Sequence, residues 1–173
     1  MEKKMKKYEL TSETKVINGV KLHRIKALNS FGNIKKGELG GWIENEKNLS
    51  QDGNAWVCEN ATVRGNATVD GNARISGNAW VYYNAKVGGN AEVSGNADFI
   101  VFKNWWSSGR YFTWTRSNNK WKVGCFYGSG EELIVKAYKD SEKSGREYER
   151  VVKYVESILK EENNDDEYNK GTY

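Results

Sequence analysis

A strict six-residue repeat in the middle of the chain restricts its fold more than any other feature of the sequence. Eight units follow one another from Asn54 to Val101 without a gap: NAWVCE, NATVRG, NATVDG, NARISG, NAWVYY, NAKVGG, NAEVSG and NADFIV. Every unit begins with Asn-Ala and has an aliphatic residue or Phe at its fourth position. A period of six gives no continuous apolar stripe on a helix, but it suits short strands joined by tight corners.

The repeat predicts a coil with three short parallel strands per turn, so that every third unit stacks in the same wall. Ala follows each Asn because the walls converge near the corners, where only a small side chain fits. Gly-Asn pairs form the corners, since both residues tolerate positive φ. The expected stacks are Val57, Ile75 and Val93 in one wall, Val63, Val81 and Phe99 in the second, and Val69 and Val87 in the third.

This run resembles the hexapeptide-repeat left-handed β-helix, which has an aliphatic residue at position i and a small residue at i+4. The resemblance implies a mainly β protein with a short left-handed parallel β-helix of about three coils over residues 54–101. Such a short stack has two open ends, and each would act as a template for edge-to-edge association. We therefore expect the flanking segments to cap it.

The segment before the repeat, residues 1–53, reads as an N-terminal β cap. Asn18-Gly19 lies between apolar residues and predicts a tight hairpin. Leu39-Gly40-Gly41-Trp42-Ile43 then leads toward the first coil.

The segment after the repeat, residues 102–162, reads as an aromatic α+β module made of a β-meander and two helices. Capping boxes predict where the two helices start. Residues 163–173 read as a frayed acidic tail. The capping boxes are Ser129 with Glu132 and Ser144 with Glu147.

The chain also resembles small proteins of bacteriophages and prophages of Gram-positive bacteria. The resemblance rests on GELGGWIENEKNLSQDGNAWV, on the NAxVxG run and on WKVGCFYGSGEEL. It implies an origin and a fold, and it implies no particular activity.

Composition sets broad limits on location and partners. The net charge of +4 is too small to indicate a nucleic-acid or membrane partner by itself. Cys58 and Cys125 lack metal-ligand spacing and fit a reducing compartment. No apolar run is long enough for a signal peptide or a membrane span. We therefore expect a cytoplasmic protein of a bacterial host.

The sequence argues against catalysis. Hexapeptide acyltransferases resemble this repeat, and that resemblance implies a catalytic His as general base for the acceptor. The chain has one histidine, His23, which lies before the repeat. A zinc site of the carbonic-anhydrase type needs three His ligands, and no phosphate-binding loop motif occurs. We expect no enzyme activity, no catalytic residue, no cofactor and no metal site.

Aromatic residues on the outside of the coil are the first candidate binding surface. Trp80, Tyr82 and Tyr83 lie in one unit, and Trp56 lies outward in another wall. Exposed Tyr and Trp side chains are typical of interfaces. Three alternatives remain open: a cap folds over this face, the chain self-associates, or a foreign protein binds.

The aromatic and basic segment 98–127 is the second candidate. Trp105, Trp106 and Arg110 lie in an expected loop and are candidate partner-binding residues. Aromatic and basic residues together also suit single-stranded nucleic acid, although a small sheet needs the same aromatics for its core. The possible nucleic-acid contacts are Lys103, Arg116, Lys120 and Lys122.

These observations favour a non-catalytic protein-binding module. We expect a phage-encoded accessory protein that binds, and inhibits, a host protein such as a defence or nuclease complex. The chain is expected to form a homo-oligomer, either a dimer or a trimer, without membrane contact. Single-stranded nucleic-acid binding is the first alternative, and hexapeptide-type acyl transfer is the least favoured one.

Overall fold

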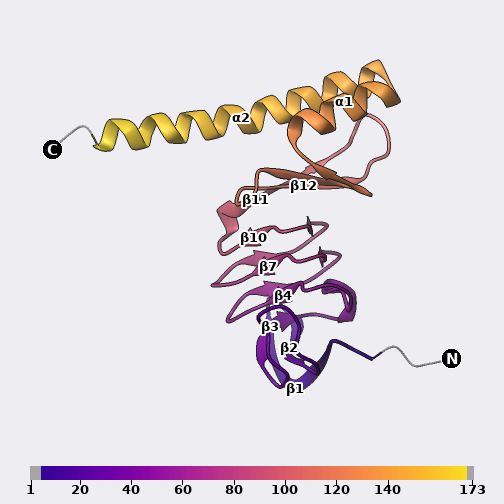
Figure 1. The fold of residues 1–173 in the computed structure, drawn as a ribbon, viewed down its shortest axis with the longest axis vertical. Coiled ribbons are helices and arrows are strands. Elements are labelled where there is room, and N and C mark those ends of the chain that lie inside the picture. The colour runs from indigo at the N-terminus through magenta and orange to yellow at the C-terminus, as the bar shows by residue number, and fades with distance from the viewer. Residues whose placement is uncertain (1–4, 171–173) are drawn as a thin grey trace.

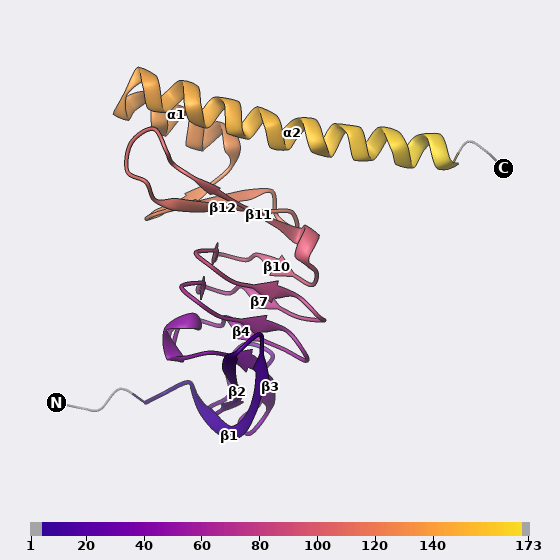
Figure 2. The same cartoon turned by 180° about the vertical axis from the view of Figure 1, so that it is seen from behind.

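The computed structural model describes residues 5–170, which form a mainly β protein with two helices at its C-terminal end (Figure 1). Short parallel strands are stacked in the middle of the molecule. A β hairpin with a third strand closes one end of this stack, and a four-stranded antiparallel sheet with both helices closes the other (Figure 2).

The stack, which we call the coil region (residues 54–95), consists of two-residue strands in three walls. Each strand pairs in parallel with a strand three units away along the chain, so that Val57 lies beside Ile75, and Val63 beside Val81. This pairing confirms the predicted stacking of the walls. The strands are β4 (Trp56–Val57), β5 (Thr62–Val63), β6 (Thr68–Val69), β7 (Arg74–Ile75), β8 (Trp80–Val81), β9 (Lys86–Val87) and β10 (Glu92–Val93).

The corners form as the repeat predicts. Gly65 and Gly71 have φ values of +67° and +66°, a conformation that favours glycine. Asn side chains stack from coil to coil, because the Asn54 amide donates to Asn72 at 3.1 Å and Asn72 donates to Asn90 at 3.0 Å. The Ala of each unit in the coil region is fully buried at the converging walls.

The eighth hexapeptide does not continue the coil region, which corrects the prediction. A 3-10 turn, η2 (Asn96–Asp98), ends the last corner. The Asp98 carboxylate accepts backbone hydrogen bonds from Ser94 at 2.7 Å and Gly95 at 2.8 Å, and these bonds lower its pKa although partial burial opposes the shift. The Asp98 carboxylate thereby accepts backbone hydrogen bonds that carbonyl groups of a further coil would otherwise accept. Phe99, expected to stack above Val81, instead begins the antiparallel strand β11 (Phe99–Lys103).

Three strands cap the N-terminal end of the coil region. The strands β1 (Tyr8–Ile17) and β2 (Val20–Ala27) form the hairpin that Asn18-Gly19 predicts, and β3 (Leu39–Ile43) joins β2 to β5. The strand β3 lies directly against the first coil. A Cβ at Gly40 would lie 2.5 Å from the Val57 carbonyl oxygen, so only glycine fits there.

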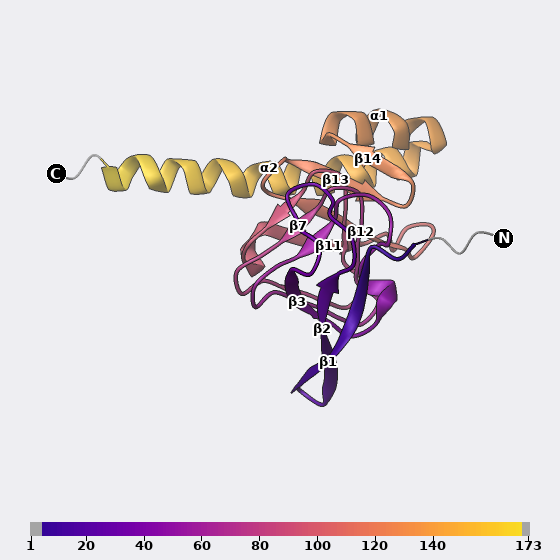
Figure 3. The ribbon, with the colours of Figure 1, turned by 60° about the horizontal axis from the view of Figure 1, so that its bottom comes forward.

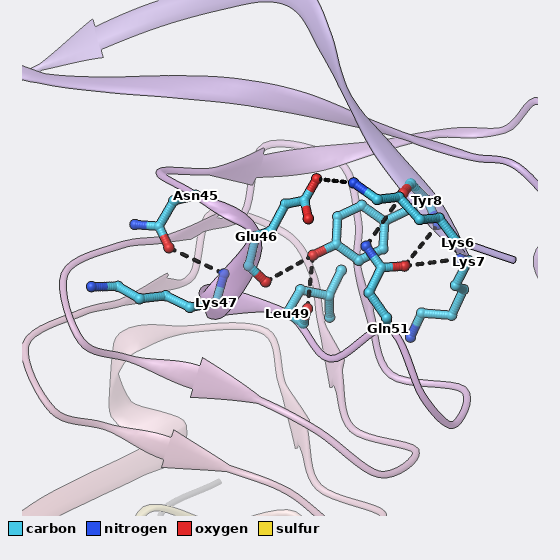
Figure 4. A network of polar contacts seen from close by, with 8 residues as sticks. All are labelled: Lys6, Lys7, Tyr8, Asn45, Glu46, Lys47, Leu49 and Gln51. Atoms are coloured by element: carbon cyan, nitrogen blue, oxygen red, sulfur yellow. Dashed lines mark hydrogen bonds and ion pairs between the residues drawn. The ribbon is translucent and has the colours of Figure 1, made fainter. Parts of the chain in front are cut away.

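Buried polar contacts close this end (Figure 4). The short helix η1 (Glu46–Asn48) lies next to the start of β1, and the Tyr8 hydroxyl donates to the Leu49 carbonyl at 2.7 Å. The Lys7 ammonium donates to the Ala55 carbonyl at 2.9 Å. Burial lowers the pKa of Lys7 to about 8, although Asp52 opposes the shift, and burial also raises the pKa of Tyr8 well above its usual value.

The C-terminal module begins with β11 and continues with three antiparallel strands and two helices. Trp114 and Trp121 are fully buried between this sheet and the helices. The elements after β11 are β12 (Tyr111–Thr115), β13 (Lys120–Val123), β14 (Phe126–Gly128), α1 (Gly130–Asp140) and α2 (Glu142–Lys170).

The helix ends agree only partly with the predictions. Ser129 and Glu132 form the expected capping box of α1. Ser144, expected to cap the second helix, lies inside α2, which begins at Glu142. The expected frayed tail, 163–173, is helical up to Lys170, and residues 171–173 lie outside the described part of the chain. The helix α2 extends well beyond the sheet (Figure 1).

Side chains of the C-terminal module accept hydrogen bonds from the free edge of the last coil. Backbone N–H groups of the coil donate to the Thr113 hydroxyl from Lys86 at 2.9 Å and to the Ser117 hydroxyl from Glu92 at 2.8 Å. The edge is therefore covered and does not remain a template for another strand.

Candidate functional site

The strands β1, β2, β3, β5 and β8 form one five-stranded sheet that joins the N-terminal cap to the coil region. Arg24, Trp42, Thr62 and Trp80 are in register across four of these strands. Residues in register on neighbouring strands point to the same side of a sheet. These four side chains therefore share the outer face of the sheet.

Cations cover the aromatic rings on this outer face. The Lys15 ammonium lies 4.4 Å from the centre of the Trp42 ring, and the Arg24 guanidinium lies 5.6 Å from it. Burial, together with the charge of Arg24, lowers the pKa of Lys15. The Arg64 guanidinium lies 5.6 Å from the ring centres of both Trp80 and Tyr82. The end of the β1–β2 hairpin projects away from this sheet (Figure 3).

Two hollows lie next to each other along this face and share Tyr82 and Tyr83; together we call them the aromatic groove. The larger hollow, of about 590 Å³, lies between β8 and β11. The smaller one, of about 320 Å³, lies on the side of the N-terminal cap. The larger is lined by Trp80, Tyr82, Tyr83, Asn84, Asn96, Phe99, Ile100, Val101 and Tyr111, and the smaller by Val20, Glu44, Arg64, Gly65, Tyr82 and Tyr83.

Tyr83 stands at a coil corner where most units have glycine. Its φ of +56° is in the left-handed region, and its side chain is 74% exposed. Its ring centre lies 4.9 Å from that of Tyr82, so the two rings form one wall shared by both hollows.

Glu44 is the carboxylate of the smaller hollow. Its Oε2 atom accepts a hydrogen bond of 2.6 Å from the backbone N–H of Gly65. Glu44 follows β3 directly and Arg64 follows β5 directly, and the Glu44 N–H donates to the Val63 carbonyl. The two charged residues are therefore neighbours on the same edge of the hollow.

The structure brings together Trp80, Tyr82 and Tyr83, but not Trp56. Trp56 is 1% exposed and packs edge-on against Tyr8 and Phe31 of the N-terminal cap. Trp56 points outward from the coil as expected, in register with Arg74, but the cap covers it, so the expectation that it is exposed for a partner is wrong. The cap folds over that wall and leaves the wall with Trp80 open.

The Trp105-Trp106 pair is divided between the surface and the core. Trp105 is 70% exposed, whereas Trp106 is 8% exposed and packs edge-on against Tyr148, with 4.9 Å between the two ring centres. Trp106 is therefore a core residue and not the partner-binding residue that we expected. Arg110 lines a separate hollow of about 230 Å³ beside α1 and α2, away from the aromatic groove.

The basic residues predicted for nucleic acid do not form one surface with exposed rings. Arg116 pairs with Glu162 at 2.6 Å, and Lys122 lies 3.8 Å from Asp70. Lys103 lies over Tyr111, which lines the larger hollow. Lys120 is a half-buried residue of β13, and the rings of Phe112, Trp114 and Trp121 in this sheet are buried in its core.

His23 lies outside the aromatic groove. It pairs with Ile43 in the sheet, and its Nδ1 atom lies 3.4 Å from the Thr11 carbonyl oxygen. Among residues 5–170, no group of three His, Cys, Asp or Glu side chains is arranged to hold a metal ion. Cys58 and Cys125 are both free thiols. No helix in the described part of the chain is long and apolar enough to cross a membrane.

Sequence reasoning missed Glu44 and Arg64. The repeat itself contains the signal for Arg64, because three units separate it from Tyr82 and the two residues stack on one wall. Glu44 lies before the repeat, and nothing in its sequence neighbourhood places it beside Arg64.

Part of the chain is similar to the uncharacterized acetyltransferase YdcK of Escherichia coli (strain K12), with 36% identity over 61 residues. The match covers 31% of this chain and 19% of that protein, so the chain spans about a fifth of the relative's length. No family profile matches the chain.

This similarity corrects two expectations about function. It contradicts the expected non-catalytic role through binding of a host protein, and it contradicts the expectation that the chain is not an enzyme. It favours the alternative that the sequence ranked last, hexapeptide-type acyl transfer. The phage or prophage origin stays a prediction.

Proposed function

We propose that this chain transfers an acyl group from a thioester donor such as acetyl-coenzyme A, which lies in the larger hollow of the aromatic groove. The observation that carries the proposal is the groove itself, a lined hollow on the outer face of the parallel coil. The similarity to an acetyltransferase supports the choice of reaction. We also propose that the coil region is a left-handed β-helix of the hexapeptide type, as its six-residue repeat suggests.

The size and lining of the groove suit such a donor. Its larger hollow, about 590 Å³, is in the range of small-molecule sites, and the rings of Trp80 and Phe99 give it apolar walls. A coenzyme A donor combines an apolar arm with phosphate groups. Lys103, whose ammonium lies over the ring of Tyr111 beside the larger hollow, supplies positive charge for those phosphates.

A direct binding measurement tests the proposal. We expect acetyl-coenzyme A to bind the wild-type chain in isothermal titration calorimetry, and Trp80→Ala to weaken binding by about tenfold or more, because the variant no longer offers a large ring to the donor. Trp105→Ala is the matched control, since it removes an exposed Trp outside the groove. Absence of binding at millimolar donor, or equal affinity of Trp80→Ala and wild type, would refute the proposal.

A further inference from the structure

The smaller hollow of the aromatic groove contains a carboxylate and a guanidinium that do not form an ion pair with each other in the described residues. Glu44 and Arg64 both line this space of about 320 Å³. Within the described residues, neither side chain takes part in an ion pair. Opposite charges on neighbouring strands ordinarily attract each other. Here each of the two groups makes another contact instead.

Each charged group is held in place by a contact that leaves part of it free. The Oε2 atom of Glu44 accepts the Gly65 N–H, while Oε1 has no hydrogen-bond partner in the described residues. The Arg64 guanidinium lies over the rings of Trp80 and Tyr82. A guanidinium stacked on a ring keeps the N–H groups at its edge available for a carboxylate.

We propose that this hollow binds a small zwitterion, an amino acid with a free ammonium and a free carboxylate, whose amine accepts the acyl group. The ammonium lies between Glu44 and the exposed ring of Tyr83, and the carboxylate meets Arg64. Val20 and Tyr83 offer apolar contact to the side chain of the ligand. This inference rests on the proposed acyl transfer, because it names the acceptor of that reaction.

The chemistry balances with these residues alone. One ammonium proton passes to the free oxygen of Glu44, which leaves a neutral amine. The amine nitrogen then forms a bond to the thioester carbonyl carbon, and the carbon–sulfur bond breaks. The second N–H proton ends on the leaving thiolate, and the proton on Glu44 passes to solvent. The products are an amide, a free thiol and one proton.

Three compounds of the same shape separate the two charges. L-Leucine carries both, 3-methylbutylamine lacks the carboxylate, and 4-methylpentanoate lacks the amine. We expect L-leucine to bind the wild-type chain at least about tenfold more tightly than either analogue in titration calorimetry, because each analogue lacks one of the two charged groups that the hollow recognises. We expect Glu44→Gln to bind L-leucine no more tightly than 4-methylpentanoate, because the ammonium of leucine then has no carboxylate partner. We expect Arg64→Gln to bind L-leucine no more tightly than 3-methylbutylamine, because the carboxylate of leucine then has no guanidinium partner.

The chain contains a matched control for Glu44. Glu59 also stands beside a corner, and its Oε2 atom accepts the Gly77 N–H at 2.7 Å, but it does not line the aromatic groove. Glu59→Gln should leave all three affinities unchanged. The amide oxygen of Gln can still accept the backbone N–H in both variants, so both should fold, as circular dichroism would verify.

The outcomes separate this inference from the proposed function. Equal binding of the three compounds, or no binding of L-leucine when acetyl-coenzyme A does bind, would overturn the inference alone. L-Leucine binding with the expected pattern, followed by N-acetylleucine in mass spectrometry, would support both. The same binding pattern without any N-acetylleucine would support the zwitterion site and overturn its role as acceptor site, whereas the proposed function is decided separately by the binding of acetyl-coenzyme A.

Discussion

Gly40→Ala tests how the N-terminal cap lies on the coil region. The new methyl group would lie 2.5 Å from the Val57 carbonyl oxygen, 2.6 Å from Ile25 Cγ1 and 2.7 Å from Trp56 Cζ2. All three neighbours are buried, so no flexible side-chain end can move aside. Relief requires β3 to move away by roughly 1 Å, since carbon atoms need about 3.5 Å.

That movement has a cost that can be estimated. Overpacking of a well-packed core costs about 1 to 3 kcal/mol, and each backbone hydrogen bond weakened between β3 and β5 costs about 1 kcal/mol. The Trp42 N–H to Ala61 carbonyl bond, 2.9 Å long, is one of these. We therefore expect Gly40→Ala to lower the free energy of unfolding by about 3 kcal/mol.

Urea unfolding followed by tryptophan fluorescence measures this loss. The control is Gly95→Ala, because Gly95 has an extended φ of −146° and its added Cβ would meet nothing closer than 3.9 Å. The control should remain within about 0.5 kcal/mol of wild type. If Gly40→Ala were equally harmless, β3 could not lie against the first coil as described.

Three further substitutions test other parts of the structure. The folded-state pKa of Lys7 is about 8 against 10.5 unfolded, so the unfolded chain holds more protons between these values and stability rises with pH. From pH 8 to 10, wild type should gain about 2 kcal/mol over Lys7→Met in urea titrations, and parallel curves would exclude the lowered pKa. Thr113→Val leaves the partly buried Lys86 N–H without its acceptor and should cost about 1 to 2 kcal/mol in thermal unfolding; no loss would mean that the edge of the last coil is not sealed there. Tyr83→Gly should be as stable as wild type or up to about 1 kcal/mol more stable, yet bind acetyl-coenzyme A more weakly; a clearly destabilised variant would indicate a structural role.

The repetitive part of the fold was predictable because each residue there follows one local rule. Six-residue spacing fixes which side chains stack, and Gly-Asn fixes the corners, so the pairing of Val57 with Ile75 could be inferred directly. The point where the coil ends was not predictable from the same rule. The unit NADFIV keeps the pattern, but the Asp98 carboxylate closes the last corner and diverts Phe99 into another sheet.

The candidate site was only half predictable, for a related reason. Trp80, Tyr82 and Tyr83 stand out because they break the repeat. Trp56 breaks it in the same way but is buried, since the loop with Phe31 and the start of β1 cover its wall. Which wall a cap covers depends on contacts between distant segments, and sequence spacing does not report them. Glu44 was missed because β3 pairs with the coil from outside the repeat.

The backbone at Tyr83 connects the fold to the proposed chemistry. A left-handed residue with a Cβ costs about 1 kcal/mol or more relative to glycine, which stands at the corresponding corners Gly65 and Gly89. Glu59 is the other residue of the coil region that has a positive φ without being glycine, and its side chain offsets the strain by accepting a hydrogen bond from the Gly77 N–H. Tyr83 is 74% exposed, and its ring contact is with Tyr82, so the fold gains little from it. Tyr83 therefore combines a strained backbone with an exposed ring between the two hollows. A contact between this ring and a ligand in the groove explains the residue better than a contribution to stability does.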